Sequence, residues 1–397
     1  MKRFTALLTA LVLLLLVPAS AFAREITDEE LALIEKYSRI ESLMQTLMDE
    51  YYIELDEETL LQGAIDGMFA SLDDPYSFFY TKEEMEKQKE ESSGEYKGVG
   101  MSVTMNGDGK IRVVRVFMNS PADVAGLLSG DLLVGIDGDT LDVQNAKDLD
   151  EAVMRLRGTD YSEVTLTIER GGETFDVTVT RGDININYTE FSMIDEIGYI
   201  QIFQFESTTA ASFRTAEKYL KECGAQGLIV DLRDNPGGML DSVVEICDEL
   251  LGRGKVVYTI DRAGNMTTYY SDDAMWDIPL VVLINGNSAS ASEIFSAAMQ
   301  DYDRGTVMGT TSFGKGIVQV LYTYPDGTGV QFTESSYYTP SGRSIHKIGV
   351  DPDIVVELRE DYDPSIHGVD LNNDNQLAAA VGEVRRLISG QADESNE

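Results

Sequence analysis

The pattern of apolar and polar residues divides the chain into stretches of different character. Between residues 27 and 90, apolar side chains recur at helical spacing in an acidic background. We predict a helix over 58–72 and another that opens at Thr81, because Thr81 and Glu84 have the spacing of a capping box. Pro75 separates these two helices, since proline disfavours helix in the residue before it. The stretch is therefore predicted to be helical.

Residues 96–182 show shorter, alternating patterns. We predict strands over 112–117 and 132–136 and a hairpin that turns at 171–172. Two short helices are predicted over 120–127 and 147–156, the first with a proline in its opening turn. This stretch is predicted to be β-rich with two helices.

From residue 183 onward, predicted strands alternate with predicted helices. The runs 227–232 and 279–284 are almost wholly apolar, which is typical of strands buried on both faces of a parallel sheet. Helices are predicted after each, over 239–251 and 291–301, and a last helix over 376–387. The fold class is therefore α/β multidomain.

Composition narrows the classes of partner. The chain has 397 residues, enough for two or three domains, and carries 31 Lys and Arg against 69 Asp and Glu, a net charge of −38. Such a charge repels nucleic acid and anionic lipid. We therefore expect no nucleic-acid partner.

The first 23 residues have the features of a secretory signal. Lys2 and Arg3 precede an apolar run over 7–17, and Ala21 and Ala23 supply small residues at a cleavage position. The run is short for a membrane span, which needs about 20 residues. We expect export, to the medium, the periplasm or the cell envelope, with an uncleaved membrane anchor as the alternative.

The sequence offers little for metal or redox chemistry. Cys223 and Cys247 lie in apolar helical patterns, and we expect two reduced, buried thiols. His346 and His367 are the only histidines and lie in polar stretches without a ligand pattern. Asp370 opens an EF-hand-like spacing but lacks the later glycine and glutamate, so a polar helix cap is the favoured reading. No metal or cofactor is predicted.

Serine and lysine carry the candidate chemistry. Two histidines leave little room for a Ser-His-Asp triad, whereas Ser288, Ser290 and Ser292 cluster where a strand meets a helix. Lys315 lies between two glycines, and a buried lysine with a lowered pKa is a competent base for a serine hydroxyl. The alternative is that Ser290 only caps its helix, because Glu293 follows at capping-box spacing.

These motifs resemble the carboxyl-terminal processing proteases, also called tail-specific proteases. The resemblance spans residues 27 to about 385 and rests on the order of the segments and on the motifs in 228–238 and 288–319. It implies a signal peptide, a helical N-terminal region, a PDZ domain, a ClpP/crotonase-like α/β catalytic core and a C-terminal acidic segment with a helix. The corresponding boundaries are 1–23, 24–95, 96–182, 183–356 and 357–397.

The resemblance also implies roles for single residues. Ser290 is the nucleophile, Lys315 the base and Gln319 the residue that orients the lysine. The N–H groups of Gly238 and Ala291 form the oxyanion hole, with Gly237 left open as a second choice for the first donor.

Peptide recognition is the second implied activity. The segment Gly98-Val99-Gly100-Met101 is predicted to bind a terminal carboxylate through successive N–H groups, with peptide added along the following strand. Arg157, after the second PDZ helix, is a candidate sensor of bound peptide. The expected partners are protein substrates with free C-terminal tails, and the terminal helices resemble the dimerising arms of the family, which suggests a homodimer.

Two other functions compete with the exported serine endopeptidase. One is a catalytically inactive PDZ-type scaffold that binds protein C-termini, which the presence of Ser290, Lys315 and Gln319 argues against. The other is a different acyl-transfer enzyme on a related α/β core, which would turn over esters without needing residues 96–182.

Overall fold

A computed structural model describes residues 27–93, 95–105, 110–158, 161–360, 362 and 369–394. The predicted signal segment 1–23 and His367 lie outside the described residues. The chain divides into two compact units, Met1–Asp74 and Pro75–Glu397. No helix within the described residues is long and apolar enough to cross a membrane.

Helices form the N-terminal region, as predicted. The first unit contains α2 (Asp28–Glu50) and α3 (Glu57–Ala70), and Asp56 caps α3 by accepting the N–H of Thr59. In the second unit α4 spans Lys82–Ser93. The Thr81 N–H donates to Glu84, and the Glu84 N–H donates back to the Thr81 hydroxyl. The predicted capping box is therefore confirmed.

The PDZ-like stretch folds around a sheet of order β3-β4-β5-β7-β8, with β6 paired to β5. The strands are β3 (Met101–Met105), β4 (Ile111–Val116), β5 (Leu132–Ile136), β6 (Asp139–Thr140), β7 (Glu163–Arg170) and β8 (Glu173–Thr180). The two helices are α5 (Pro121–Val124), capped by Ser120, and α6 (Ala146–Leu156). A separate pair, β2 (Glu95–Gly98) and β9 (Gly182–Asn185), joins the two ends of this stretch. Strand β3 is thereby an edge of the sheet.

The core contains a second sheet that is largely parallel. Its order is β10-β11-β12-β15-β16-β19, and only the β10–β11 pair is antiparallel. The strands are β10 (Thr189–Ile194), β11 (Ile197–Ile202), β12 (Gly227–Asp231), β15 (Leu280–Ile284), β16 (Thr306–Gly309) and β19 (Ile354–Val355). The predicted runs of buried strand are thus confirmed.

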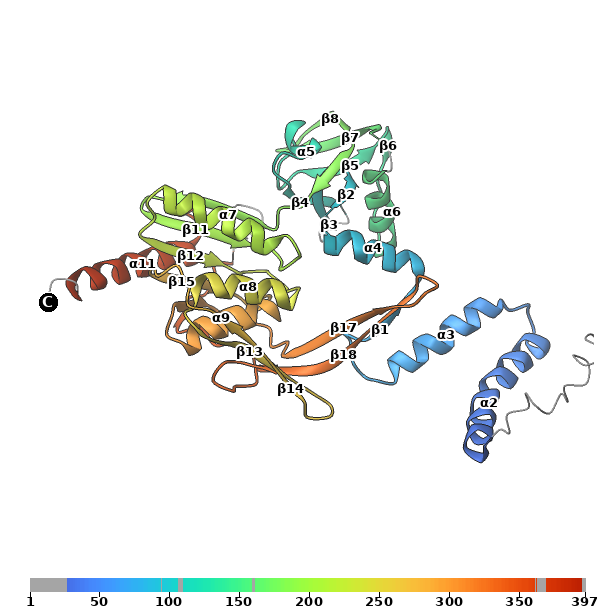
Figure 1. Cartoon of the computed structure of the whole chain (residues 1–397). Helices are drawn as coiled ribbons and strands as arrows, with labels where there is room; N and C mark the ends of the chain where they lie inside the picture. Colours follow the sequence, from blue (N-terminus) through green and yellow to red (C-terminus); the bar gives the residue numbers. More distant parts are fainter. Residues whose placement is uncertain are drawn as a thin grey trace, which may run out of the picture. The chain divides into compact units, whose positions relative to one another are not determined.

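Helices cover both faces of this sheet, which explains its unbroken apolar strands. The helices α7 (Thr209–Glu222), α8 (Leu240–Leu250) and α9 (Ala291–Asp301) pack against side chains such as Val230 and Val282. The helix α11 (Asn375–Glu394) packs on the opposite face, against Ile229 and Val281 (Figure 1). Neighbouring strand residues therefore enter different cores.

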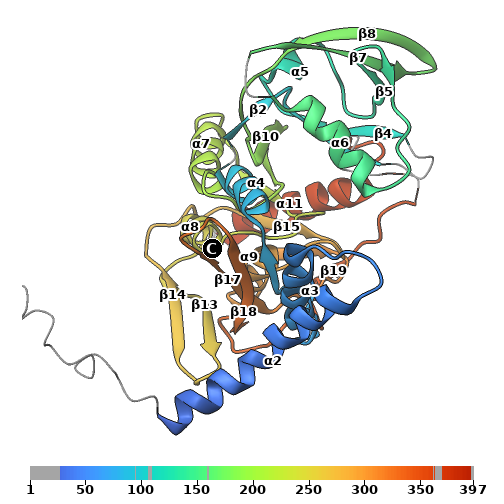
Figure 2. The ribbon, with the colours of Figure 1, turned by 90° about the vertical axis from the view of Figure 1, so that its right-hand side faces the viewer.

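An antiparallel sheet forms the other part of the core, and the sequence pattern did not predict most of it. Its order is β1-β18-β13-β14, with β17 also paired to β18. The strands are β1 (Phe78–Tyr80), β13 (Gly254–Asp261), β14 (Met266–Ser271), β17 (Ile317–Thr323) and β18 (Gly329–Tyr338). The β13–β14 hairpin projects from the core (Figures 1 and 2). Strand β1 brings the segment after the N-terminal helices onto β18.

A buried ion network ties α11 to the parallel sheet. The Arg233 guanidinium donates to the carboxylates of Asp231 and Asp374, and all three side chains are almost fully buried. Burial alone would lower the pKa of Arg233, but the two carboxylates raise it above its ordinary value. Asp374 also accepts the Leu377 N–H, which confirms the predicted polar cap of the last helix. The same carboxylate therefore caps the helix and accepts from Arg233.

One expectation about the cysteines is wrong. Cys247 is buried and free, as expected, but Cys223 is free and exposed. Cys223 directly follows the last residue of α7, so the helical pattern that buries Phe213, Ala216 and Leu220 ends before it.

Candidate active site

One cavity of about 450 Å³ brings together the residues predicted for chemistry. Its lining includes Ser290, Lys315, Gln319, Gly238 and Ala291. They come from the β15–α9 junction, from β17 and the loop before it, and from the turn before α8. Residues far apart in sequence therefore share one hollow with the nucleophile candidate.

Backbone strain and side-chain partners distinguish Ser290 from its two neighbours. Ser290 has a φ of 55° and a ψ of −111°, an unusual conformation for a residue with a side chain. Ser288 is fully buried and donates to the Leu232 carbonyl, and Ser292 is fully buried and donates to the Asn235 carbonyl. Both neighbours therefore hold the strand-to-helix turn, whereas Ser290 faces the cavity.

The Glu293 carboxylate joins the serine loop to the lysine loop. It is fully buried and accepts the N–H groups of Ser290 and Lys315, each at 2.8 Å. It also accepts the Gly314 N–H at 2.7 Å and the hydroxyl of Ser312. From the sequence, Glu293 was predicted only as part of a helix cap. Its hydrogen bonds with Ser312, Gly314 and Lys315 were not predicted.

A tyrosine makes a second bridge between the same two loops. The Tyr337 hydroxyl, on β18, lies 3.0 Å from the Ser290 carbonyl oxygen and 2.7 Å from that of Lys315. Burial, together with the nearby Glu293 carboxylate, raises the pKa of Tyr337 well above its ordinary value. The phenol thus stays a neutral donor. No local sequence signal marks Tyr337, because its partners lie far away in the chain.

The turn after β12 approaches the serine closely. Gly237 and Gly238 have φ angles of 104° and 137°, which favour glycine. A Cβ at Gly237 would lie 2.7 Å from that of Ser290, and one at Gly238 would lie 2.2 Å from the Phe205 carbonyl oxygen. The Gly237 N–H donates to the Asn235 side chain at 2.8 Å, whereas Gly238 lines the cavity. This arrangement favours Gly238 over Gly237 as an oxyanion donor.

Gln319 lines the cavity from an irregular part of strand β17. Strand β17 begins at Ile317, after Lys315, and its pairing with β18 shifts register between Val318 and Gln319. Simple alternation from Lys315 to Gln319 therefore fails. The Gln319 amide donates to the Thr333 hydroxyl at 3.3 Å and still lines the cavity with the lysine.

A second, smaller hollow lies in the PDZ-like domain between β3 and α6. It measures about 220 Å³, and its lining includes Val99, Met101 and Arg157 from the predicted peptide site. Gly98 ends β2, where it pairs with Gly182, and Gly100 makes the turn with a φ of 85°. The Val99 carbonyl accepts the Ala122 N–H. The predicted peptide-binding segment thus lies beside an apolar groove at the free edge of β3.

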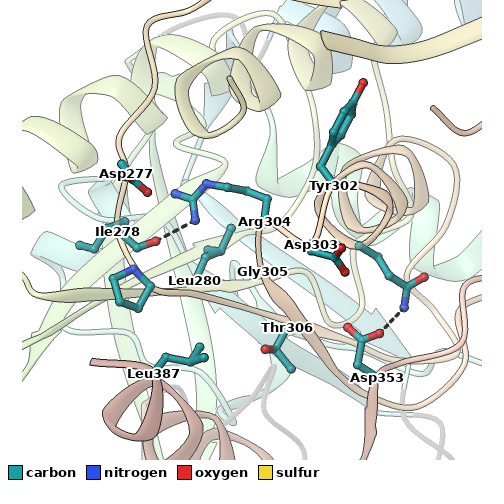
Figure 3. Close-up of a pocket in the computed structure, with 12 residues that line it drawn as sticks. Asp277, Ile278, Leu280, Tyr302, Asp303, Arg304, Gly305, Thr306, Asp353 and Leu387 are labelled. Atoms are coloured by element: carbon teal, nitrogen blue, oxygen red, sulfur yellow. Dashed lines mark hydrogen bonds between the residues drawn. The ribbon is translucent and has the colours of Figure 1, made fainter. Parts of the chain in front are cut away.

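A third hollow, of about 500 Å³, is lined by Arg304, Tyr302, Asp353 and Leu387 among others (Figure 3). The Arg304 guanidinium donates to the carbonyls of Leu250, Trp276 and Ile278, a structural tie rather than a ligand site. Its described lining includes none of the predicted site residues. Across the part of the chain that the structure describes, no group of three or more His, Cys, Asp or Glu residues is placed to hold a metal ion.

Known proteins match the chain in the same order of segments. Residues 196–356 match peptidase family S41, residues 98–180 a PDZ domain, and residues 19–84 the N-terminal domain of the activating protease CtpB. A carboxy-terminal-processing protease of Bartonella bacilliformis is 36% identical over 348 residues, which cover 85% of this chain and 79% of that protein. The chain belongs to the carboxy-terminal-processing protease family.

Two further relatives agree with this membership. A probable CtpA-like serine protease of Staphylococcus aureus is 34% identical over 324 residues, or 81% of this chain, which spans 64% of that relative's length. The solved photosystem II D1 C-terminal processing protease is 28% identical with a TM-score of 0.52, covering 88% of this chain and 96% of that one. The predicted family and the predicted fold class, a PDZ domain joined to an α/β peptidase core, are confirmed.

Proposed function

We propose that this family member is an exported serine endopeptidase that cuts protein substrates near their C-termini with a Ser290/Lys315 dyad. The observation that carries the proposal is the cavity shared by Ser290, Lys315, Gln319, Gly238 and Ala291. The strained backbone of Ser290 also supports it, because strain at such positions is often part of a site's mechanism.

The chemical steps follow from these residues. The Ser290 hydroxyl oxygen bonds to the scissile carbonyl carbon while its proton passes to Lys315 Nζ. The Gly238 and Ala291 N–H groups stabilise the oxyanion. The carbon–nitrogen bond then breaks as Lys315 returns the proton to the leaving amine. Water attacks the acyl-enzyme, with Lys315 again accepting a proton and passing it back to Ser290.

The surrounding residues hold this geometry in place. Glu293 and Tyr337 each contact the backbones of both Ser290 and Lys315, so the two loops are held together before substrate binds. Such preorganisation favours a fast reaction, because a displacement of about 1 Å between the reacting atoms lowers the rate by a large factor. Gln319 orients the lysine from β17.

Substrate choice is assigned to the PDZ domain. The free edge of β3 suits addition of an extended peptide, and the groove beside it is lined by Val103, Phe117 and Leu156. These side chains favour an apolar last residue, and Arg157 lies at the same groove as the peptide sensor. Proteins with free C-terminal tails are the proposed substrates.

Export and assembly complete the proposal. The basic and apolar pattern of residues 1–23 supports export, with an uncleaved anchor as the alternative. Tyr37, Leu43 and Met68 are large apolar side chains exposed on α2 and α3. A surface of this kind is typical of helices that pair with a second copy, so we infer a homodimer.

Digestion of an unfolded protein tests the proposal. Wild-type protein and Ser290→Ala are incubated with an unfolded substrate that bears an apolar, free C-terminus, and fragments are mapped by mass spectrometry. Wild type should produce cuts near the C-terminus, whereas Ser290→Ala should bind the substrate without cutting it. Binding without cleavage by both proteins would favour the inactive scaffold instead.

A further inference from the structure

An aromatic ring from the N-terminal side of the chain lies over the proposed base. The Nζ atom of Lys315 is 4.4 Å from the centre of the Tyr76 ring. Tyr76 precedes β1, far from the serine and lysine motifs in sequence. The face of an aromatic ring carries partial negative charge and attracts an ammonium group within about 6 Å.

The segment that carries Tyr76 is fastened to the catalytic core. Strand β1 pairs with β18, so that Phe78 is opposite Gln331. The Gln331 side chain donates to the Tyr76 carbonyl at 3.2 Å. The Thr333 N–H donates to the buried Ser77 hydroxyl at 3.1 Å. The ring is therefore held against the lysine from the same strand, β18, that carries Tyr337.

We propose that Tyr76 is a positioning residue for Lys315. The ring of Tyr76 holds the lysine Nζ in place and stabilises the ammonium that forms when the lysine takes the proton of Ser290. This proposal rests on the Ser290/Lys315 dyad. In a serine triad, a carboxylate orients the base and stabilises its protonated form. Here the ring of Tyr76 shares that role with Gln319, because its electron-rich face holds Nζ and stabilises the protonated form.

Other ionisable groups surround the lysine and stay in place when Tyr76 is changed. Glu293 accepts the Lys315 backbone N–H, and the Tyr337 phenol donates to the Lys315 carbonyl. Glu206 lines the same cavity, and the backbone of His346 packs closely against Gly316. Because these groups are common to wild type and Tyr76 variants, a difference between the two reports the ring.

The ring has a distinctive effect on the pH–rate profile. It stabilises the ammonium both in the resting enzyme at low pH and in the transition state. Removing it should therefore slow the reaction where the resting lysine is neutral and leave the rate nearly unchanged where the resting lysine is already charged. A merely structural defect would instead lower the rate by a similar factor at every pH.

The experiment measures kcat and kcat/KM of the full chain against pH, with one peptide substrate, for wild type, Tyr76→Phe and Tyr76→Leu. Tyr76→Phe keeps the ring and should match wild type. Tyr76→Leu should lose about fivefold on the alkaline plateau, and the midpoint of its acid limb should move down by about 0.5 to 1 pH unit. Its profile should converge with that of wild type in acid.

Tyr80→Leu is the matched control. Tyr80 is an aromatic residue of the same segment whose hydroxyl contacts Gln331 and whose ring packs on Phe78. Its loss should leave the midpoint of the acid limb where it is. The proposal is overturned if Tyr76→Leu lowers activity equally at all pH values, if it has no effect, or if Tyr76→Phe is as impaired as Tyr76→Leu.

A second variant series applies if Tyr76→Leu fails to fold. Phenylalanines with increasing fluorination at position 76 keep the ring's shape and weaken its negative face. The alkaline rate should fall with each added fluorine, and an unchanged rate would also overturn the proposal. Ser290→Ala distinguishes a failure of the dyad from a failure of the role of Tyr76, because cleavage by Ser290→Ala contradicts the dyad itself.

Discussion

Glu293 Oε2 accepts the backbone N–H of Lys315 at 2.8 Å. The same oxygen accepts the N–H of Ser290, also at 2.8 Å, while Oε1 accepts from Gly314 and Ser312. An ionised carboxylate only accepts hydrogen bonds, so every one of these donors meets an acceptor. One buried side chain therefore fixes the backbone of both the proposed nucleophile and the proposed base.

Glu293→Gln should weaken both stability and catalysis. The new amide group points a donor at N–H groups that need an acceptor, and a buried hydrogen bond to a charged group is worth about 1.5 to 3 kcal/mol. We expect a loss of about 2 to 4 kcal/mol in the free energy of unfolding by denaturant titration. The kcat of the protein that remains folded should also fall.

Glu222→Gln is the control for that substitution. Glu222 is exposed at the end of α7, so its change should leave stability and kcat as they are. An unchanged kcat in folded Glu293→Gln would show that the carboxylate serves the fold alone.

Local patterns predicted the parts of the site that depend on local structure. Ser290 stands at a strand-to-helix junction, and Lys315 is marked by flanking glycines, so the sequence alone made both residues candidates, and the structure places them in one cavity. The sequence did not indicate Tyr337 or Tyr76. Both lie near their partners only because strands of the antiparallel sheet pair: Tyr337 is on β18, and Tyr76 precedes β1, which pairs with β18. Pairing between distant strands leaves no periodic signal in the segment itself.

Irregular backbone was the other obstacle to prediction. A strand from Lys315 to Gln319 would place both side chains on one face, but the register shift after Val318 breaks that alternation. The buried strands of the parallel sheet were recognised, because residues packed on both faces leave a continuous apolar run.

Lys315→Arg should be as inactive as Lys315→Ala, although it keeps the positive charge. Arginine stays protonated, so it cannot accept the serine proton. In the wild type, activity should rise with pH as the lysine ammonium loses its proton and fade in acid as the amine takes one up. Peptide cleavage assays across pH measure both effects.

Lys315→Arg should still fold and should still bind peptide through the PDZ domain. These two measurements are the control that the variant protein is intact. Near-normal cleavage by this variant would falsify the dyad. His346, whose backbone packs against Gly316, would then become the next candidate base.

Amidation of a peptide's C-terminus should remove most of its affinity for the PDZ domain. The Gly98–Met101 segment is proposed to bind the carboxylate through backbone N–H groups, and an amide lacks the negative charge and one acceptor. We expect at least a tenfold weaker Kd, since a charge-assisted hydrogen bond is worth about 1.5 to 3 kcal/mol. Fluorescence anisotropy with Ser290→Ala, which leaves the peptide intact, measures this.

A matched peptide with a polar last residue tests the apolar groove separately. Its affinity should fall because Val103, Phe117 and Leu156 line the hollow beside β3. Equal binding of the acid and the amide would contradict the carboxylate site and leave strand addition as the mode of recognition.

Arg233→Lys should destabilise the core although lysine keeps the positive charge. Arg233 donates through all three guanidinium nitrogens, to Asp231, Asp374 and Gln376, and a single ammonium cannot reach this planar set of acceptors. Breaking a buried ion network costs about 3 to 5 kcal/mol. Chemical denaturation should show a loss of this size, accompanied by lower activity, because Asp231 ends the strand that leads into the Gly237–Gly238 turn.

Arg253→Lys is the matched surface control for this prediction. Arg253 pairs with Asp273, and both side chains are more than two-thirds exposed, so solvent screens the pair. This variant should unfold at the same denaturant concentration as wild type. If Arg233→Lys behaved likewise, the network that joins α11 to β12 would not contribute to stability. The C-terminal helix would then be held by its other contacts, such as the apolar contacts of Leu377, Val381 and Val384 and the ion pairs of Arg385 with Asp195 and Glu196.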